Sequence, residues 1–186
     1  MKRLAAALLL AALMLPAVSL AYKKTSGAEM TFPSMTSGTL TGEIRARTGP
    51  GSDYAAVGST GSNGDILDVL SYAYDRSGTV WVQVSASVND LPVRIYTELT
   101  HILLRDAACL SADSNFNEVV HTLRAAEPML GPGYQYATYT FTLPKNSEVT
   151  VIQMEHDMNT EEYFTMCDFY RDGRKYRGWF PSDMIP

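Results

Sequence analysis

The chain is 186 residues long and acidic, with 15 Lys and Arg against 20 Asp and Glu and a formal charge of −5 at pH 7. This sign argues against nucleic acid as a partner, because such binding draws on a basic face that neutralises phosphates. The same argument disfavours simple electrostatic adhesion to anionic membranes or anionic wall polymers.

The first 21 residues have the pattern of an export signal. Two basic residues, Lys2 and Arg3, precede an apolar run over residues 4–15, and Ser19-Leu20-Ala21 forms a cleavage pattern. The run is shorter than the roughly 20 apolar residues needed to span a bilayer. We therefore expect a signal peptide, residues 1–21, that is cleaved after Ala21. The mature protein would be secreted or associated with the cell envelope and would have no membrane span; a retained anchor is the alternative.

Residues 22–39 combine Ser, Thr, Gly and Met without a sustained period, which predicts a flexible leader. The first strand that follows must end at Gly49-Pro50-Gly51, because proline lacks an amide donor and glycine permits turns closed to other residues. Short alternating strands come next. Residues 79–88 are the clearest of them, with valines at every second position on one face.

The turn occurs twice in the chain. Gly49-Pro50-Gly51 and Tyr54 recur with the same internal spacing as Gly131-Pro132-Gly133 and Tyr136. This recurrence indicates that a whole structural unit has been duplicated.

The repeat continues through the strands that follow the turn. The offset that relates the two turns also aligns residues 64–70 with 146–152 and Trp81 with Tyr163, and one further slip aligns Tyr96 with Trp179. Chance similarity rarely keeps one register across turns and strands alike, so the pattern predicts a tandem repeat. We expect one domain at residues 40–103, a connector at 104–117 and a second domain at 118–186.

The strand pattern predicts the all-β class. Each repeat supplies about five short strands, and a sustained 3.6-residue period of an amphipathic helix is missing from both. So few strands cannot build a two-sheet sandwich of normal size. We therefore expect each repeat to close as a small, strongly bent barrel.

Together these residues resemble the bacterial SH3-like (SH3b) domain family. Its pattern opens with an Arg-containing turn, Gly-Pro-Gly, a spacer and Tyr, and it closes with Gly-Trp and an Ile. The first copy has Arg45 and Arg47 before its turn, and the second ends with Gly178-Trp179 and Ile185. The resemblance implies two tandem SH3-like barrels in a non-catalytic adapter that needs no cofactor.

Domains of this family commonly accompany cell-wall hydrolases or occur in secreted proteins. The resemblance therefore implies a module that binds peptidoglycan, other cell-wall glycan peptides or a cell-envelope protein. The alternative is a structural or protein-protein interaction protein with no small ligand.

Peptides and sugars both bind flat aromatic rings that are edged by hydrogen-bonding groups. The repeat supplies six candidate rings for such a ligand-binding platform. They are Tyr54, Trp81, Tyr96, Tyr136, Tyr163 and Trp179. The alternative is that these rings fill the core of each barrel or brace its turns.

Two cysteines, Cys109 and Cys167, allow either a disulfide or two separate thiols. A bridge would close a long loop and stabilise the protein by about 4 kcal/mol. Neither cysteine shares a motif with a histidine, so a thiol nucleophile with a His base is not expected. A structural zinc site needs four grouped Cys or His ligands, and the sequence has no such group, so we expect no metal site.

Two charged clusters stand in the second repeat. The acidic residues are Glu155, Asp157, Glu161 and Glu162. They lack the ordered alternation and the glycine of a calcium loop, which favours a solvated hairpin tip. The basic residues are Arg171, Arg174, Lys175 and Arg177. They flank an Asp-Gly turn, where such charges keep a sheet edge soluble; binding of an acidic peptide terminus is the alternative.

Overall fold

The computed structural model describes residues 36–114 and 116–186. These residues form two compact units, of which unit 1 ends at Asp113 and unit 2 begins at Ser114. Antiparallel strands dominate both units, which confirms the predicted all-β class. The predicted signal peptide, residues 1–21, lies outside the described residues.

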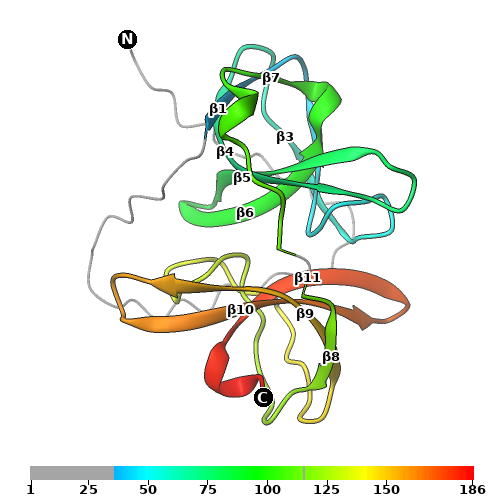
Figure 1. The fold of residues 1–186 in the computed structure, drawn as a ribbon, viewed down its shortest axis with the longest axis vertical. Coiled ribbons are helices and arrows are strands. Elements are labelled where there is room, and N and C mark those ends of the chain that lie inside the picture. Colours follow the sequence, from blue (N-terminus) through cyan, green and yellow to red (C-terminus); the bar gives the residue numbers. More distant parts are fainter. Residues whose placement is uncertain (1–35, 115) are drawn as a thin grey trace. The chain divides into compact units, whose positions relative to one another are not determined.

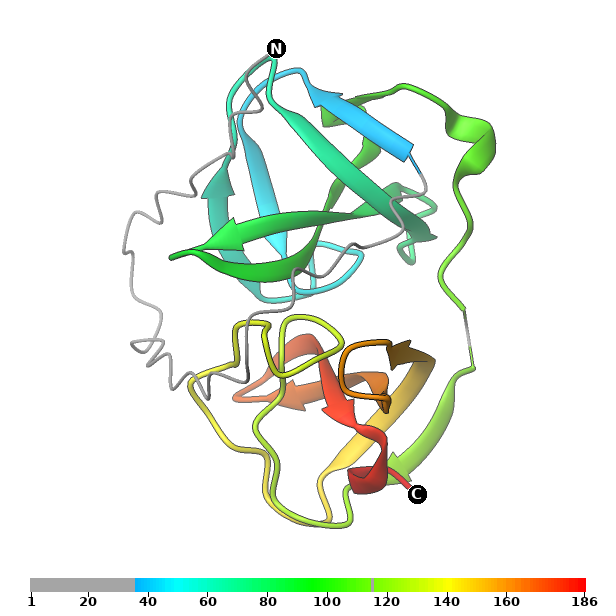
Figure 2. The same ribbon diagram turned by 90° about the vertical axis from the view of Figure 1, so that its left-hand side faces the viewer.

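Unit 1 is a single curved sheet (Figure 1). Its strands are β1 (Thr36–Leu40), β2 (Ile44–Arg47), β3 (Ala56–Thr60), β4 (Ile66–Tyr74), β5 (Val80–Val88), β6 (Leu91–Glu98) and β7 (Ile102–Leu104), with short 3-10 helices at Leu99–His101 and Ala107–Cys109. They pair in the order β3-β2-β6-β5-β4-β1-β7, and the described ladder ends at β3 and β7 without joining them. Figure 2 shows these strands crossing one another at steep angles. Their buried apolar side chains, which include Val69, Val84 and Ile95, form the core.

The prediction of a flexible leader over residues 22–39 is wrong at its end, because Thr36–Leu40 forms β1. This strand lies between β4 and β7, with Thr39 opposite both Ile66 and Leu103. Alternate residues of β1 are buried. The small residues of this segment have a loop-like composition, and pairing with a strand on each side overrides that weak local preference.

Unit 1 also includes most of the predicted connector, residues 104–117. The segment from 111 to 113 runs beside Tyr72 in β4. The amide of Tyr72 donates to the carbonyl oxygen of Ser111 at 3.0 Å, and the amide of Asp113 donates to the carbonyl oxygen of Tyr72 at 2.7 Å. These backbone hydrogen bonds add the connector to the sheet, so the first unit extends past the end that its strand pattern suggests.

Unit 2 contains a four-stranded sheet in the order β11-β10-β9-β8 (Figure 1). Its strands are β8 (Glu118–His121), β9 (Glu148–Asp157), β10 (Glu162–Arg171) and β11 (Arg174–Pro181), followed by a 3-10 helix at Ser182–Met184. Two buried clusters pack on this sheet. One includes Phe169 and Phe180, and the other includes Phe164, Met166 and Trp179. Successive side chains of a strand point to opposite faces, which explains how neighbouring residues of β10 enter different clusters.

The duplicated turn has the same backbone geometry in both units. Gly51 has a φ of 145° and Gly133 a φ of 144°, in the region that favours glycine. The amide of Tyr54 donates to the carbonyl oxygen of Gly51 at 3.2 Å, and the amide of Tyr136 donates to that of Gly133 at the same distance. The third residue of each Gly-Pro-Gly therefore bends the chain and turns the tyrosine back onto it.

The first glycine of each turn lies against the tyrosine ring. A methyl carbon added to Gly49 would stand 2.2 Å from the ring of Tyr54, and one added to Gly131 would stand 2.1 Å from the ring of Tyr136. Only a residue without a Cβ admits this contact unless the ring moves. The repeated motif is thus a tyrosine packed on a glycine, formed twice.

The two units also share a β-bulge. It falls at Leu70 in β4 and at Ile152 in β9, which the repeat aligns with each other, and both side chains are buried. A bulge inserts one residue that has no partner and increases the bend of the strand. From the Gly-Pro-Gly turns to these bulges, corresponding residues of the two units are related by the offset that the sequence predicts.

Candidate functional site

Five of the six repeated aromatic rings are buried. The exposed fraction is 4% or less for Tyr54, Trp81, Tyr96, Tyr136 and Trp179. A ring that solvent does not reach offers no face to a sugar or a peptide. These five residues therefore do not form the predicted platform, and they follow the alternative interpretation, in which the rings fill cores and brace turns.

From β5 onward the offset between the two units is one residue larger than at the turns. Gln83 lies opposite Tyr96 in unit 1, and Met166 lies opposite Trp179 in unit 2. The additional residue enters in the hairpin turn before β10, because both bulges upstream of this turn keep the smaller offset. The slip thus comes earlier in the chain than the sequence alignment places it.

Tyr163 is exposed because of this slip. The residue of unit 2 that corresponds to Trp81 is Phe164, which is fully buried. Neighbouring residues of a strand face opposite sides, so a shift of one residue moves a side chain from the core to the surface. Tyr163 is 55% exposed, and its ring lies over that of His156 with the centroids 4.6 Å apart.

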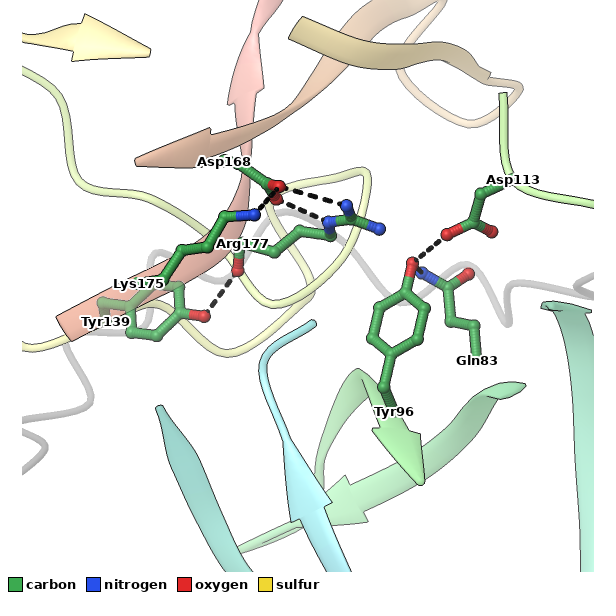
Figure 3. A network of polar contacts seen from close by, with 7 residues as sticks. All are labelled: Gln83, Tyr96, Asp113, Tyr139, Asp168, Lys175 and Arg177. Atoms are coloured by element: carbon green, nitrogen blue, oxygen red, sulfur yellow. Dashed lines mark hydrogen bonds and ion pairs between the residues drawn. The ribbon is translucent and has the colours of Figure 1, made fainter. Parts of the chain in front are cut away.

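A buried polar network surrounds Tyr96 in unit 1 (Figure 3). The Tyr96 hydroxyl donates to Asp113 Oδ2 at 2.6 Å and accepts a hydrogen bond from Gln83 Nε2 at 3.0 Å. Ser71 Oγ donates to the other oxygen of the same carboxylate. The network ties the end of unit 1 to β4, β5 and β6, and Tyr96 has a structural role in it.

The predicted basic cluster of unit 2 is largely paired within the unit. Arg177 donates to Asp168 through Nε at 2.6 Å and through Nη2 at 3.2 Å, and Lys175 Nζ lies 2.9 Å from the same carboxylate (Figure 3). Asp168 and Arg177 are both buried. The guanidinium of Arg171 lies 4.0 Å from the centroid of the Phe141 ring. Three members of the cluster are thus engaged within unit 2, and Arg174 is its exposed member.

Of the two alternatives for the cysteines, the structure has separate thiols, because Cys109 and Cys167 are both free. Cys167 lies in the core of unit 2, where burial raises the pKa of its thiol. Cys109 is exposed, and its pKa is raised by a hydrogen bond to Asp106 and by the charge of that carboxylate. Both groups are kept in the thiol form, which is a poor nucleophile compared with a thiolate.

An exposed aromatic pair stands at the end of β4. The rings of Tyr72 and Tyr74 meet edge to face, with their centroids 5.8 Å apart and their planes at 88°. Tyr74 is 63% exposed, while Tyr72 is partly buried and its backbone is fixed by residues 111–113. We call these two residues the tyrosine pair. The sequence pattern did not single them out, because the second copy has no tyrosine in their place.

The turn beside the tyrosine pair is held by one carboxylate. Asp75 accepts hydrogen bonds from the amide of Ser77 at 2.8 Å, from the amide of Thr79 at 3.0 Å and from the indole of Trp81 at 3.1 Å. The hydrogen bond from the Ser77 hydroxyl contributes most to lowering the pKa of Asp75. The tyrosine pair thus stands on a strand that is fixed at both sides and leads into an ordered turn.

Unit 2 carries different chemistry at the corresponding positions. The repeat aligns Met154 and His156 with Tyr72 and Tyr74, before the point where the register slips. His156 contacts Tyr163 across the hairpin, and Met154 is exposed. The same place in the repeat therefore presents two phenol rings in one unit and soft or nitrogen donors in the other.

Comparison of the chain with protein-family models, with curated proteins and with solved structures finds no match. Within residues 36–114 and 116–186, three or more His, Cys, Asp or Glu side chains do not gather closely enough to hold a metal ion. In the same ranges, no helix has the length and apolar character to cross a membrane. What the exposed surfaces can bind is therefore judged from their own chemistry.

Proposed function

We propose that this protein is an exported, non-catalytic binding protein built from two SH3-like barrels, and that it recognises peptidoglycan or another glycan peptide of the cell envelope. The tyrosine pair carries this proposal. It is an exposed, ordered aromatic surface at the end of a strand, and the two turns of identical geometry support the duplicated architecture.

The tyrosine pair suits a ligand that combines flat apolar faces with hydroxyl or amide groups. A phenol ring offers an apolar face to a sugar ring or a peptide side chain, and its hydroxyl makes hydrogen bonds at the edge. The backbone of Tyr72 is fixed by hydrogen bonds to residues 111–113, so little conformational freedom is lost on binding. The exposed ring of Tyr74 is supported by its edge-to-face contact with Tyr72.

The thiols argue against a cysteine hydrolase as the function of the chain. Both have a raised pKa, for which the causes are burial at Cys167 and the neighbouring Asp106 at Cys109. A cysteine hydrolase requires a thiolate, which these surroundings disfavour.

Retention on purified peptidoglycan tests the proposal. We expect the protein to sediment with insoluble peptidoglycan, and Tyr74→Ser to reduce the bound fraction at least about threefold, since stacking on a ring contributes on the order of 1 kcal/mol. Tyr170→Ser is the matched control, because Tyr170 lies in unit 2 and is 62% exposed against 63% for Tyr74. Equal retention of the two variants would contradict a role of the tyrosine pair.

The second candidate function is interaction with an envelope protein and no small ligand. Burial of five of the six repeated rings favours it, because those rings serve the fold. Wild-type protein that is not retained on peptidoglycan at low and at moderate salt would contradict the wall-binding proposal and favour this one. A photo-crosslinking residue at position 74 would then capture the protein partner from intact cell envelopes.

A further inference from the structure

Three potential metal ligands alternate along the end of β9 and the start of the turn that follows. They are Met154, His156 and Met158, which form a Met-x-His-x-Met sequence. Met154 and His156 share one face of the strand, because side chains two residues apart point the same way. Their sulfur and nitrogen donors differ from the carboxylates that make up the acidic cluster of the same hairpin.

Two of these donors already meet. His156 Nδ1 lies 3.3 Å from Met158 Sδ. A thioether sulfur is only a weak hydrogen-bond acceptor, so this contact offers little as a hydrogen bond. The same separation suits a nitrogen and a sulfur atom that bind one ion, since metal bonds to these atoms are roughly 2.0 to 2.3 Å long.

The turn that carries Met158 is built by Asp157. Its buried carboxylate accepts hydrogen bonds from the amide of Asn159 at 3.0 Å and from the hydroxyl of Thr160 at 3.1 Å, and its carbonyl oxygen accepts one from the amide of Glu161 at 2.9 Å. The carboxylate is thus engaged in the turn and not available as a ligand. Met158 itself is 77% exposed, so the ordered turn displays the thioether to solvent.

The imidazole of His156 is oriented on its other sides as well. Its ring packs against Tyr163, and Nε2 lies 3.9 Å from Glu161 Oε2. This separation is longer than a hydrogen bond, so the packing on Tyr163 is what positions the ring. Nδ1 is left facing Met158.

We propose that Met154, His156 and Met158 bind one soft monovalent cation, Cu(I). Thioether sulfur selects Cu(I) among biological cations, and imidazole also suits copper, whereas hard cations such as Ca²⁺ and Mg²⁺ require oxygen ligands. Met154 completes the site, because its three rotatable bonds allow the exposed sulfur to move toward the other two donors.

The duplication supplies an internal comparison. Unit 1 has Tyr72 and Tyr74 at the positions of Met154 and His156, and it therefore lacks the donors. We expect one ion per chain, bound by unit 2.

Titration of the whole protein carrying Cys109→Ser with Cu(I) tests the site, because the exposed thiol of Cys109 is itself a soft donor. The titration is run without oxygen against the chromogenic chelator bicinchoninate, and Ag(I) serves as a probe that does not change oxidation state. We expect one equivalent of each ion to bind, and ¹³C-methyl NMR to show shifts for Met154 and Met158 on addition of Ag(I). Met154→Leu, Met158→Leu and His156→Gln should each weaken Cu(I) binding at least about tenfold.

The control variants are His121→Gln, which removes an exposed histidine of the same unit, and Tyr74→Ser in unit 1. Both should bind Cu(I) as the wild type does. Absence of binding or unchanged affinity in Met158→Leu would each overturn the proposal. Met158 is exposed and leucine has a similar volume, so loss of fold does not explain a weaker site; a thermal unfolding curve of each variant checks this. Peptidoglycan retention by Met158→Leu separates this proposal from the wall-binding function, which does not depend on the ion.

Discussion

At the scale of single residues, the glycine under each tyrosine explains why the Gly-Pro-Gly sequence occurs twice. Tyr54 and Tyr136 are buried, and each covers the first glycine of its turn. The second glycine of the turn has a positive φ in both units. The repeated motif is therefore a packing device.

This packing predicts the effect of a methyl group under the ring. Gly49→Ala places a Cβ 2.2 Å from the ring of Tyr54, so the ring must move. We expect the free energy of unfolding to fall by about 1–3 kcal/mol, as in other overpacked cores. Gly42→Ala is the control, because it meets no atom within 4 Å and should change the free energy by less than about 0.5 kcal/mol. Urea unfolding followed by circular dichroism measures both, and equal effects would contradict this packing.

At the scale of elements, strand identity was more predictable than register. The turns and most strands follow from glycine, proline and alternating valines, whereas the alignment of Trp81 with Tyr163 fails by one residue. Hairpin turns differ in length between the two copies, and turn residues show no periodicity that locates an insertion. A shift of one residue exchanges the two faces of a strand. The sequence alignment therefore matched the exposed Tyr163 with the buried Trp81.

The two candidate sites were not predicted from the sequence, because their residues are not repeated in the other copy. Tyr72 and Tyr74 became conspicuous only when the structure showed their exposure and their edge-to-face contact. Likewise, Met154, His156 and Met158 are visible as a pattern in the sequence, but only the turn built by a buried aspartate brings a sulfur beside the imidazole. Duplication directs attention to what the two copies share, whereas both proposed sites lie where the copies differ.

The β4–β5 hairpin predicts a pH dependence. Hydrogen bonds, above all that from Ser77, lower the pKa of Asp75 below its ordinary value of 3.8. The charged carboxylate therefore stabilises the folded state at pH values above 3.8, and this contribution is lost as the pH falls through the lowered pKa. Asp75→Asn should be less stable than the wild type at pH 7, and the difference should shrink in acid. Unfolding midpoints of Asp75→Asn and the wild type, at pH 7 and in acid, measure this difference in stability. A difference that does not change with pH would contradict the stabilising role of the Asp75 carboxylate.

At the scale of the whole molecule, the boundary of unit 1 links the fold to the proposed function. Contacts continue to Asp113, well beyond the domain end predicted at residue 103. The same segment fixes the backbone of Tyr72, and its residue Asp113 accepts a hydrogen bond from the hydroxyl of Tyr96. The residues that join the two units in sequence are thus part of the first unit and of its candidate binding surface.

The boundary makes a prediction about fragments of the chain. A fragment of residues 36–113 keeps every strand of unit 1 and the network around Tyr96, so we expect it to unfold cooperatively and to be retained on peptidoglycan. A fragment of residues 36–103 lacks Asp113, and removal of the carboxylate from a buried hydroxyl costs about 1–3 kcal/mol. It also leaves Tyr72 without the hydrogen bonds to residues 111–113, so the retention of this fragment should fall even where it still folds.

Urea unfolding measures the stability of the two fragments, and sedimentation with peptidoglycan measures their retention. Equal stability and equal retention of the two fragments would show that residues 104–117 are a connector after all, because no contact of theirs would then support the sheet or the tyrosine pair.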